Sequence, residues 1–482
     1  MAAMARIVVI GAGVGGLGAA LALGRAGHEV VVLERDATPL PHDPDEAFEW
    51  DRRGAPQVRH SHALLARLRN LLRDHHPDVL AALLDAGATE LRFTEHLPPT
   101  LDDLSTQPGD DDLVALACRR TTFEWVLRRT VLAEPHVQLR DGVIVEGLES
   151  TAHPSGRPRV TGARLAGGEV VPSDLVVAAT GRRSSVPDWL AAVGAGEVPE
   201  VEEDTGIVYY SRFYRLLPGV DEPEQDGPIG ADLGYLKFAV FKGDNGTFSV
   251  TLAAGTDDRE MRVLGHEEPF EATAATLVPV APWIAPGMSE PITGVHVMAK
   301  LLNRHRRFVV DGEPVALGFA AVGDAGVCTN PLYGRGCSLA MVHAELLAEA
   351  MHDHADDPVA LALAFDEATE RELAPWYEAA VRQDRMNRVP EGEGDAGTIL
   401  AKSLLRDGVL AATRVDAVVF RAFLRSFNLL VSPDSLMADP DLMARVLAVY
   451  QTRDERPPDP PLGPDRDELL RALGSLGGST AA

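Results

Sequence analysis

Glycine spacing near the start of the chain predicts a phosphate-binding turn. Gly11, Gly13 and Gly16 form a G-x-G-x-x-G pattern between a β-branched run at 6–10 and an Ala/Leu-rich stretch. Glycines permit a tight turn and close backbone approach, so a pyrophosphate can lie at the positive N-terminus of the following helix. Glu34 ends the next apolar run, where its carboxylate can accept hydrogen bonds from a ribose hydroxyl. We expect a dinucleotide site, although this spacing fits both FAD and NAD.

The composition is that of a globular, acidic protein. The chain has 482 residues, of which 45% are hydrophobic, and 45 basic against 72 acidic side chains give a net charge of −27. Such a polyanion is repelled by nucleic acid and by anionic lipid, so we expect neither as a partner. The three cysteines are too few for a disulfide framework and lack zinc-ligand spacing, which favours the cytoplasm and no metal site. The uncharged stretch at 7–24 contains six glycines and is not expected to span a membrane.

The elements that must position these residues follow from the apolar pattern. β-branched runs predict strands of a parallel sheet, and amphipathic stretches predict helices that cover it. From about 200 to 310, aromatic and polar residues alternate, which predicts an antiparallel sheet with one wet face. The expected strands lie at 6–10, 30–33, 143–145, 160–165, 174–180 and 315–322. The expected helices lie at 61–73, 121–133, 335–352, 358–389 and 403–450, with a weak last helix after the proline-rich run at 456–461.

Four segments in this order resemble the FAD-dependent single-component monooxygenases with the aromatic-hydroxylase fold. They are the glycine turn at 11–16, Arg120, the strand end at 174–181 and the segment 323–336. The resemblance covers roughly residues 5–390. It implies an α/β fold, α+β overall, in which a Rossmann-like FAD-binding domain is interrupted by an antiparallel-sheet substrate domain and followed by a C-terminal helical region.

This resemblance divides the chain into four parts. The FAD-binding domain is expected over 1–190, with small insertions near 85–118, and returns over 311–390. The substrate domain is expected over 191–310, and the C-terminal helical region and flexible tail over 391–482.

The return segment is the most specific match. Asp324 is implied to accept hydrogen bonds from ribityl hydroxyls, and the helix opening near Gly334 and Gly336 to direct backbone N–H groups at the flavin. Reduced flavin is anionic there, so a positive helix end would stabilise it. Cys337 follows closely enough to approach the flavin, or else fills packing space as buried cysteines commonly do.

Two further segments are implied to lie beside the flavin nucleotide. The family carries an arginine at the start of the helix predicted near 121; the register favours Arg120, with Arg119 as the alternative. The segment 53–65 is similar to one in bacterial flavin epoxidases of natural-product pathways, and a purely structural loop is the other interpretation. His60 and His62 are two residues apart, so on a helix they would point to different faces.

At one position the sequence departs from the family pattern in a way that concerns the source of electrons. Thr180 stands where the aromatic hydroxylases carry an aspartate before the glycine that is Gly181 here. No second glycine fingerprint marks a nicotinamide domain. We therefore expect NAD(P)H to act either by direct docking or through a separate flavin reductase.

The candidate site residues fall into two groups, catalytic candidates and cofactor contacts. Catalysis is expected to be centred on the flavin, with Arg59, His60 and Pro331 as candidate contributors. The expected cofactor contacts are Gly11, Gly13, Gly15, Gly16, Glu34, Arg35, Arg120, Val143, Thr180, Gly181, Gly323, Asp324, Pro331, Gly334, Gly336 and Cys337.

The resemblance implies a function. An FAD-dependent monooxygenase would use dioxygen to add one oxygen atom to an apolar small molecule, as an epoxide or a hydroxyl, through a flavin C4a-(hydro)peroxide, as in bacterial secondary metabolism. A flavin dehydrogenase or double-bond reductase of the prenyl-reductase type is an alternative, as is a non-catalytic flavoprotein. Hydrolase, P-loop and zinc-protease motifs and the tryptophan motif of flavin halogenases do not occur in the sequence.

Overall fold

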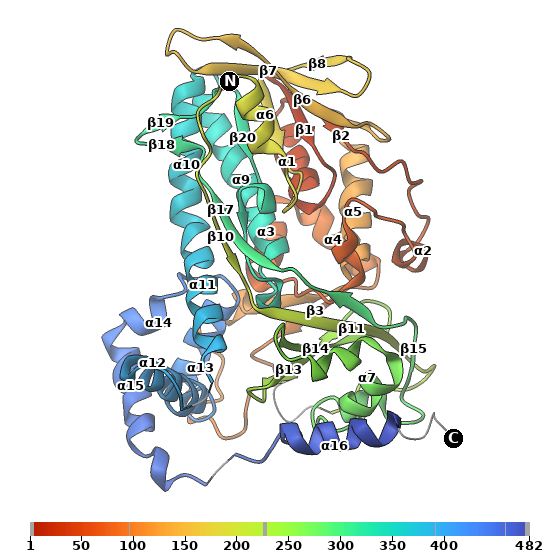
Figure 1. Cartoon of the computed structure of the whole chain (residues 1–482), viewed down its shortest axis with the longest axis vertical. Helices are drawn as coiled ribbons and strands as arrows, with labels where there is room; N and C mark the ends of the chain where they lie inside the picture. Colours follow the sequence, from red (N-terminus) through yellow and green to blue (C-terminus); the bar gives the residue numbers. More distant parts are fainter. Residues whose placement is uncertain (1–3, 96, 225–228, 391, 458, 478–482) are drawn as a thin grey trace.

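The computed structural model describes residues 4–95, 97–224, 229–390, 392–457 and 459–477. Two sheets dominate it: a parallel sheet in the upper half of Figure 1 and an antiparallel sheet in the lower half. The mixed α/β fold with a parallel Rossmann-like core, an additional antiparallel sheet and C-terminal helices confirms the fold class predicted from the sequence.

The parallel sheet has five strands in the order β20-β9-β1-β2-β5. Their bounds are β1 Arg6–Ile10, β2 Glu29–Leu33, β5 Val137–Arg140, β9 Leu175–Ala178 and β20 Phe319–Ala321. Because β-branched and aliphatic side chains point to both faces of a strand in turn, β1 serves two cores. Ile7 and Val9 pack under the helices, whereas Val8 and Ile10 pack on the opposite face.

Helices cover one face of this sheet and a small second sheet covers the other. The helical layer consists of α1 Val14–Arg25, α3 Ala66–His75, α4 Pro77–Asp85, α5 Arg120–Ala133, α9 Gly336–His354 and α10 Pro358–Glu372. The opposite layer, at the top of Figure 1, consists of β6 Val145–Ala152, β7 Pro158–Leu165, β8 Val170–Pro172 and α6 Val186–Ala192. β20, whose residues lie 143 positions after their partners in β9, thus completes the sheet.

The antiparallel sheet lies below the helical layer in Figure 1. Its strands are β11 Ile207–Leu216, β12 Gly230–Asp232, β13 Leu236–Lys242, β14 Thr247–Gly255, β15 Ser289–Pro291 and β16 His296–Met298. One face packs against α7 Glu267–Ala274, α8 Ala281–Ile284 and the last helix, α16 Arg466–Gly477. The residues that alternate with this core, such as Tyr209 and Ser211, belong to the other face.

Shorter elements connect the two halves. The linking strands are β10 Glu200–Asp204, β17 Leu302–Arg306 and β21 Val327–Cys328, and the hairpins are β3 Thr89–Arg92 with β4 Val114–Ala117 and β18 Val309–Val310 with β19 Glu313–Pro314. The remaining helices are α2 Pro44–Phe48, α11 Ala374–Arg388, α12 Ala396–Ser403, α13 Ala417–Phe427, α14 Ser435–Ala438 and α15 Pro440–Gln451, with a π-helical turn at Leu404–Leu410.

Several predicted boundaries were wrong for local physical reasons. The helix expected over 61–73 begins only at Ala66, because Leu64 is extended and its carbonyl accepts the N–H of Leu116 at 2.9 Å. The helix expected over 358–389 is two helices, since Pro375 follows the break at Leu373 and cannot donate to the preceding turn. The helix expected over 403–450 is divided among several shorter ones.

Two predicted strands also differ. The strand expected over 315–322 is ordered as β20 only from Phe319, because Gly318 has a φ of 65° and lies against Val160. The strand expected at 143–145 starts at Val145. The four-part division of the chain stays a prediction. Among the described residues, no helix is both long and apolar enough to cross a membrane.

Candidate dinucleotide and active site

The opening turn between β1 and α1 uses its glycines in two ways. A Cβ at Gly16 would lie 1.8 Å from the carbonyl oxygen of Gly11, and a Cβ at Gly11, whose φ is 103°, would lie 2.6 Å from that of Ala179. These two glycines are required by the turn itself. A Cβ at Gly13 would instead meet nothing within 4 Å. Gly13 caps α1, so open space lies where a phosphate could reach the helix N-terminus.

Glu34 is buried at the end of β2, among hydrogen-bond donors. Its carboxylate accepts the N–H of Ala12 at 2.8 Å and that of Asp36 at 2.9 Å. The Arg52 guanidinium lies 3.6 Å from Glu34 and 2.7 Å from Glu124, and donates to the carbonyl of Ala12 at 3.0 Å. A carboxylate has about four lone-pair positions, so Glu34 can still accept from a ribose hydroxyl.

Two expected neighbours of Glu34 lie at the same strand end. The N–H of Val143 donates to the carbonyl of Glu34 at 2.8 Å, which places its backbone beside the carboxyl end of β2. Arg35 is exposed and its guanidinium lies over Gly54, where a Cβ would be 3.3 Å from its Nε. Both residues are therefore placed to border the nucleoside end of a dinucleotide.

The structure separates the two candidate arginines at the start of α5. Arg119 Nη2 lies 2.6 Å from Asp244 in the β13–β14 turn, and both side chains are at most 1% exposed. Arg120 points the other way, into the motif residues. Its Nη2 donates to Glu124 at 3.1 Å and its Nη1 to the Sγ of Cys337 at 3.1 Å. Arg120 thus connects α5 to the start of α9, whereas Arg119 ties α5 to the antiparallel sheet.

His60 and His62 lie in an extended segment, not on the predicted helix. The Nδ1–H of His62 donates to the carbonyl of His60 at 2.9 Å, because a carbonyl can only accept. Its Nε2 is then free to accept from Arg120 Nη1, 3.5 Å away. Burial, followed by the charge of Arg120, lowers the pKa of His62 to about 3, so this imidazole is neutral. The nearby Arg59 is half-buried and contacts Glu49.

The strand end after β9 faces the same region. Thr180 donates to Ser184 Oγ, which fixes the turn. Gly181 has a φ of 69° and a Cβ there would meet nothing within 4 Å. The positive charge of Arg182 opposes the effect of burial on the pKa of Asp324 and adds to it on that of His60. Within the residues that the structure describes, the guanidinium of Arg182 forms no ion pair, so it is available to an anionic ligand.

The return loop is held from behind by a buried histidine. The N–H of Gly323 donates to His343 Nδ1 at 3.1 Å, and His343 Nε2 lies 3.0 Å from Thr369 Oγ1. Burial raises the pKa of Asp324, and the charges of Arg120 and Arg182 oppose this rise. Asp324 is consequently a carboxyl group near the positive charges of Arg120 and Arg182.

A buried aspartate on α11 fixes the loop that follows. Asp384 accepts from Tyr333 at 2.6 Å, from Asn330 Nδ2 at 2.8 Å and from Asn303 Nδ2 at 2.7 Å. Arg335 stacks on Tyr333, with its guanidinium carbon 4.8 Å from the ring centroid. Burial raises the pKa of Asp384, and its three hydrogen bonds oppose the rise. The loop before α9 is therefore rigidly placed.

The tip of this loop remains open. Pro331 and Gly334 are half-buried, Gly336 is exposed, and a Cβ at Gly336 would meet nothing within 4 Å. Gly334, with a φ of 67°, has the left-handed conformation that the turn into α9 requires. Cys337 is buried and contacts Arg120.

The two predicted binding segments meet. A Cβ at Gly15 would lie 3.9 Å from the Cα of Gly323, and a Cβ at Gly18 would lie 2.6 Å from the Sδ of Met341 on α9. The helices α1 and α9 therefore cross close to their N-termini, and Gly323 lies next to both, since a Cβ there would be 3.4 Å from the Cβ of Ala340. One extended dinucleotide can reach both the opening turn and the return loop.

Sequence reasoning missed four residues of this region. Arg52, Arg182, Asp384 and Ser211 belong to no motif, and each is brought to the site from a different element. Only the arginine pair at 182–183, directly after the glycine turn of β9, offered a local signal.

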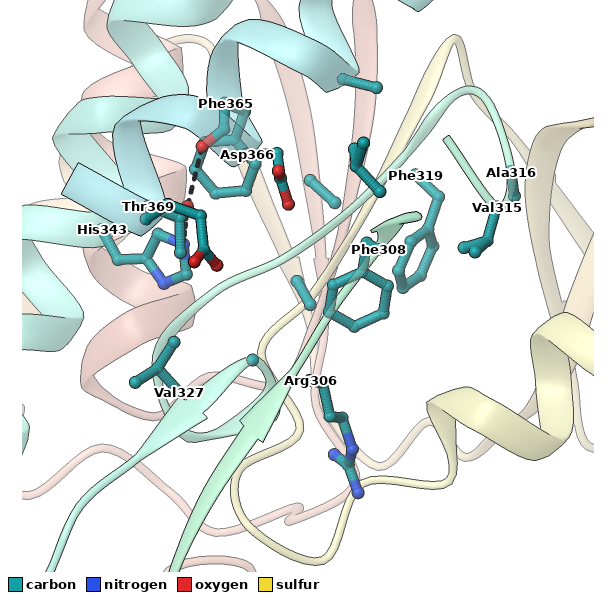
Figure 2. A pocket seen from close by; sticks show the side chains of 16 residues that line it. Arg306, Phe308, Val315, Ala316, Phe319, Val327, His343, Phe365, Asp366 and Thr369 are labelled. Atoms are coloured by element: carbon teal, nitrogen blue, oxygen red, sulfur yellow. Dashed lines mark hydrogen bonds between the residues drawn. The ribbon is translucent and has the colours of Figure 1, made fainter. Parts of the chain in front are cut away.

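A small cavity lies behind the return loop, not at the motifs. It has a volume of about 30 Å³ between β20 and α10, and Phe308, Phe319 and Phe365 line it together with Asp366 (Figure 2). This volume holds about one or two water molecules, so it cannot receive a flavin or an organic substrate.

The chain is similar in sequence to one known domain family near its start and to one known protein over most of its length. A family described as an NAD(P)-binding Rossmann-like domain matches residues 9–43. Protein Rv3254 of Mycobacterium tuberculosis is 28% identical over 464 residues, which are 90% of this chain and 91% of that protein.

Solved structures share the fold at lower identity. PqsL of Pseudomonas aeruginosa, described as a probable FAD-dependent monooxygenase, has a TM-score of 0.54 and 17% identity over 80% of this chain and 95% of its own. The anhydrotetracycline hydroxylase OxyS of Streptomyces rimosus has a TM-score of 0.56 and 19% identity over 88% of this chain and 76% of its own. The chain therefore has the fold of these FAD-dependent monooxygenases and hydroxylases, as the motif order predicted.

Proposed function

We propose that the chain is an FAD-dependent monooxygenase that adds one oxygen atom from dioxygen to a small molecule. One observation carries this proposal: the opening turn and the return loop are adjacent, since a Cβ at Gly15 would lie 3.9 Å from the Cα of Gly323, so one extended cofactor can reach both. The shared fold with a hydroxylase and a monooxygenase supports the reaction class. We further propose that the reaction is a hydroxylation or an epoxidation, and that it serves bacterial secondary metabolism in the cytoplasm.

The residues fit an FAD. Open space at Gly13 and Gly336 lies at the N-termini of α1 and α9, where N–H groups can meet the pyrophosphate and the flavin. Glu34 would hold the ribose, and Asp324 the ribityl chain. When bound and reduced, FAD would supply the electrons that activate dioxygen, which is the source of the inserted oxygen atom.

The chain's own side chains supply position and charge. Arg120 and Arg182 place positive charge beside Asp324, which favours an anionic cofactor or a developing negative charge. His62, neutral and fixed by His60 and Arg120, has no proton to release at neutral pH. The loop held by Asp384 keeps the α9 N-terminus in place.

The test has two stages. Purified chain should bind FAD with the absorption spectrum of a flavoprotein, and protein that stays colourless with added FAD would overturn the proposal. FAD-loaded protein is then incubated in air with NADPH, with and without a flavin reductase, and products are examined for the mass of one added oxygen atom. Turnover that proceeds equally without dioxygen would instead indicate a dehydrogenase or a double-bond reductase. The reductase arm decides how electrons from NAD(P)H arrive.

A further inference from the structure

A continuous polar strip crosses the face of the antiparallel sheet that is turned away from its apolar core. His60 Nδ1 lies 3.3 Å from Ser211 Oγ, which lies 2.9 Å from Thr251 Oγ1. Ser61 Oγ lies 2.7 Å from Thr251 Oγ1 and 2.7 Å from Ser249 Oγ. Four of these side chains belong to residues that are at most 7% exposed: His60, Ser211, Ser249 and Thr251. We call these five residues the hydroxyl strip.

The strip lies next to the return loop. The ring of His60 packs edge-on against Tyr209, with centroids 5.3 Å apart. Tyr209 belongs to an apolar cluster with Ile207, Ala253 and Leu301, and Met298, together with Leu332 of the loop before α9, packs against that cluster. The carbonyl of His60 accepts from His62, which faces Arg120. His60 therefore lies between the sheet face and the segments proposed to hold the flavin.

The number of hydroxyl protons indicates which group donates in each hydrogen bond of the strip. Each hydroxyl has one proton to donate, and an O–H left without an acceptor in a buried site is costly. If the strip runs from Ser249 through Ser61, Thr251 and Ser211 to His60 Nδ1, all four hydroxyl protons are used. In the opposite direction the proton of Ser249 finds no acceptor among the described residues. The favourable direction makes His60 Nδ1 an acceptor and puts the ring proton on Nε2.

The Nε2–H of His60 is then a donor without an internal partner. No described residue forms a hydrogen bond with Nε2, and the neighbouring His296, whose ring centroid is 6.1 Å away, has its own Nε2 buried and unpaired. Burial, with the charges of His296 and Arg182, lowers the pKa of His60 to about 3, so the ring is neutral at physiological pH. A neutral donor without an internal partner, on a residue that is only 6% exposed, suits a ligand oxygen that can accept a hydrogen bond.

We propose that the hydroxyl strip recognises the substrate, and that His60 Nε2–H donates a hydrogen bond to an acceptor oxygen on it, as in a ketone or a phenolate. This inference rests on the proposed function and refines its substrate class: the molecule is largely apolar but carries one such oxygen. The apolar side chains of Tyr209, Met298 and Leu332 would contact its hydrocarbon part. His60 would act as a specificity-determining residue that orients the carbon to be oxygenated.

The first experiment measures the tautomer of His60. Histidine-selective ¹⁵N labelling of the full chain gives the ring signals, and His60→Gln identifies those of His60 by their loss. We expect the Nε2–H tautomer in the wild type. In Ser211→Ala the constraint on Nδ1 is lost and a mixture of tautomers should appear, whereas Ser173→Ala, which removes a buried unpaired hydroxyl elsewhere, should change nothing. An Nδ1–H tautomer in the wild type would overturn the proposal.

The second experiment measures recognition on FAD-loaded protein. Acetophenone and α-methylstyrene have the same shape but differ in a carbonyl oxygen against a methylene group. Because one hydrogen bond is at stake, acetophenone should bind about twofold to tenfold more tightly, and His60→Leu should abolish the difference. If the protein retains FAD but binds the two probes equally, or binds neither, the proposed role of the hydroxyl strip is wrong. Loss of FAD binding itself would instead refute the proposed function and leave the tautomer result standing.

Discussion

Adjacent arginines at the start of α5 should have opposite effects when each is replaced by methionine. Arg119 neutralises Asp244, whose side chain is 0% exposed, and no second guanidinium contacts that carboxylate in the described part of the chain. Removing one partner of a buried pair typically costs about 3–5 kcal/mol. Arg120→Met leaves Glu124 paired with Arg52 at 2.7 Å, so we expect a smaller loss, about 1–2 kcal/mol.

Affinity for FAD should show the reverse order. Arg120 lies between Cys337 and Asp324 at the proposed cofactor site, and loss of one charged hydrogen bond corresponds to roughly tenfold to hundredfold weaker binding. Arg119→Met should bind FAD nearly normally below its unfolding midpoint. Urea titration followed by circular dichroism measures stability, and quenching of flavin fluorescence measures affinity.

A double replacement makes the comparison decisive. In Arg119→Met with Asp244→Asn both charges are gone, and the amide oxygen can still accept the N–H of residue 119, which Asp244 accepts at 2.8 Å. Replacing both partners of a buried pair is often nearly neutral, so at least half of the lost stability should return. If the single Arg119→Met variant is as stable as the wild type, or loses FAD as strongly as Arg120→Met, the assignment of the two arginines is wrong.

Three further outcomes are expected. Asp324→Ala should weaken FAD retention measured by ultrafiltration without lowering the urea midpoint, because burial already raises the pKa of this carboxyl and its charge is not needed for folding. Asp384→Asn, which turns an acceptor of three donors partly into a donor, should destabilise the chain by about 2–4 kcal/mol and broaden the flavin absorption bands. Burial lowers the pKa of His60 and of His343 to about 3, so the unfolded chain binds more protons than the folded one. Stability should therefore be complete above about pH 6.5 and fall as the pH drops below it, and His343→Gln should flatten this dependence of the urea midpoint.

The proposed cofactor region shows how far local sequence signals reach. The glycine turn at 11–16 and Glu34 were recognisable because a phosphate-binding turn imposes residue types at fixed spacing. The same holds for Gly323 and Asp324, where a strand ends in a turn. Even within these motifs, only the structure shows that Gly16 is required by the turn, with a Cβ 1.8 Å from a carbonyl oxygen, whereas Gly13 borders open space.

Contacts between elements far apart in the chain could not be predicted from local sequence patterns. Arg119 and Arg120 are neighbours of the same residue type, so the sequence cannot tell their roles apart. In the structure, α5 presents Arg119 to the β13–β14 turn and Arg120 to α9. His62 was wrongly expected within a helix over 61–73, since pairing of Leu64 with β4 overrides the helical pattern there.

The sequence by itself predicted the two ends of the proposed cofactor site, because turns that hold phosphate or open a helix depend on the conformational freedom of a few neighbouring residues. Only the tertiary structure decided what lies between and behind those ends. The Asp384 network and the hydroxyl strip join side chains up to 190 residues apart, and no local rule governs which buried donor meets which buried acceptor.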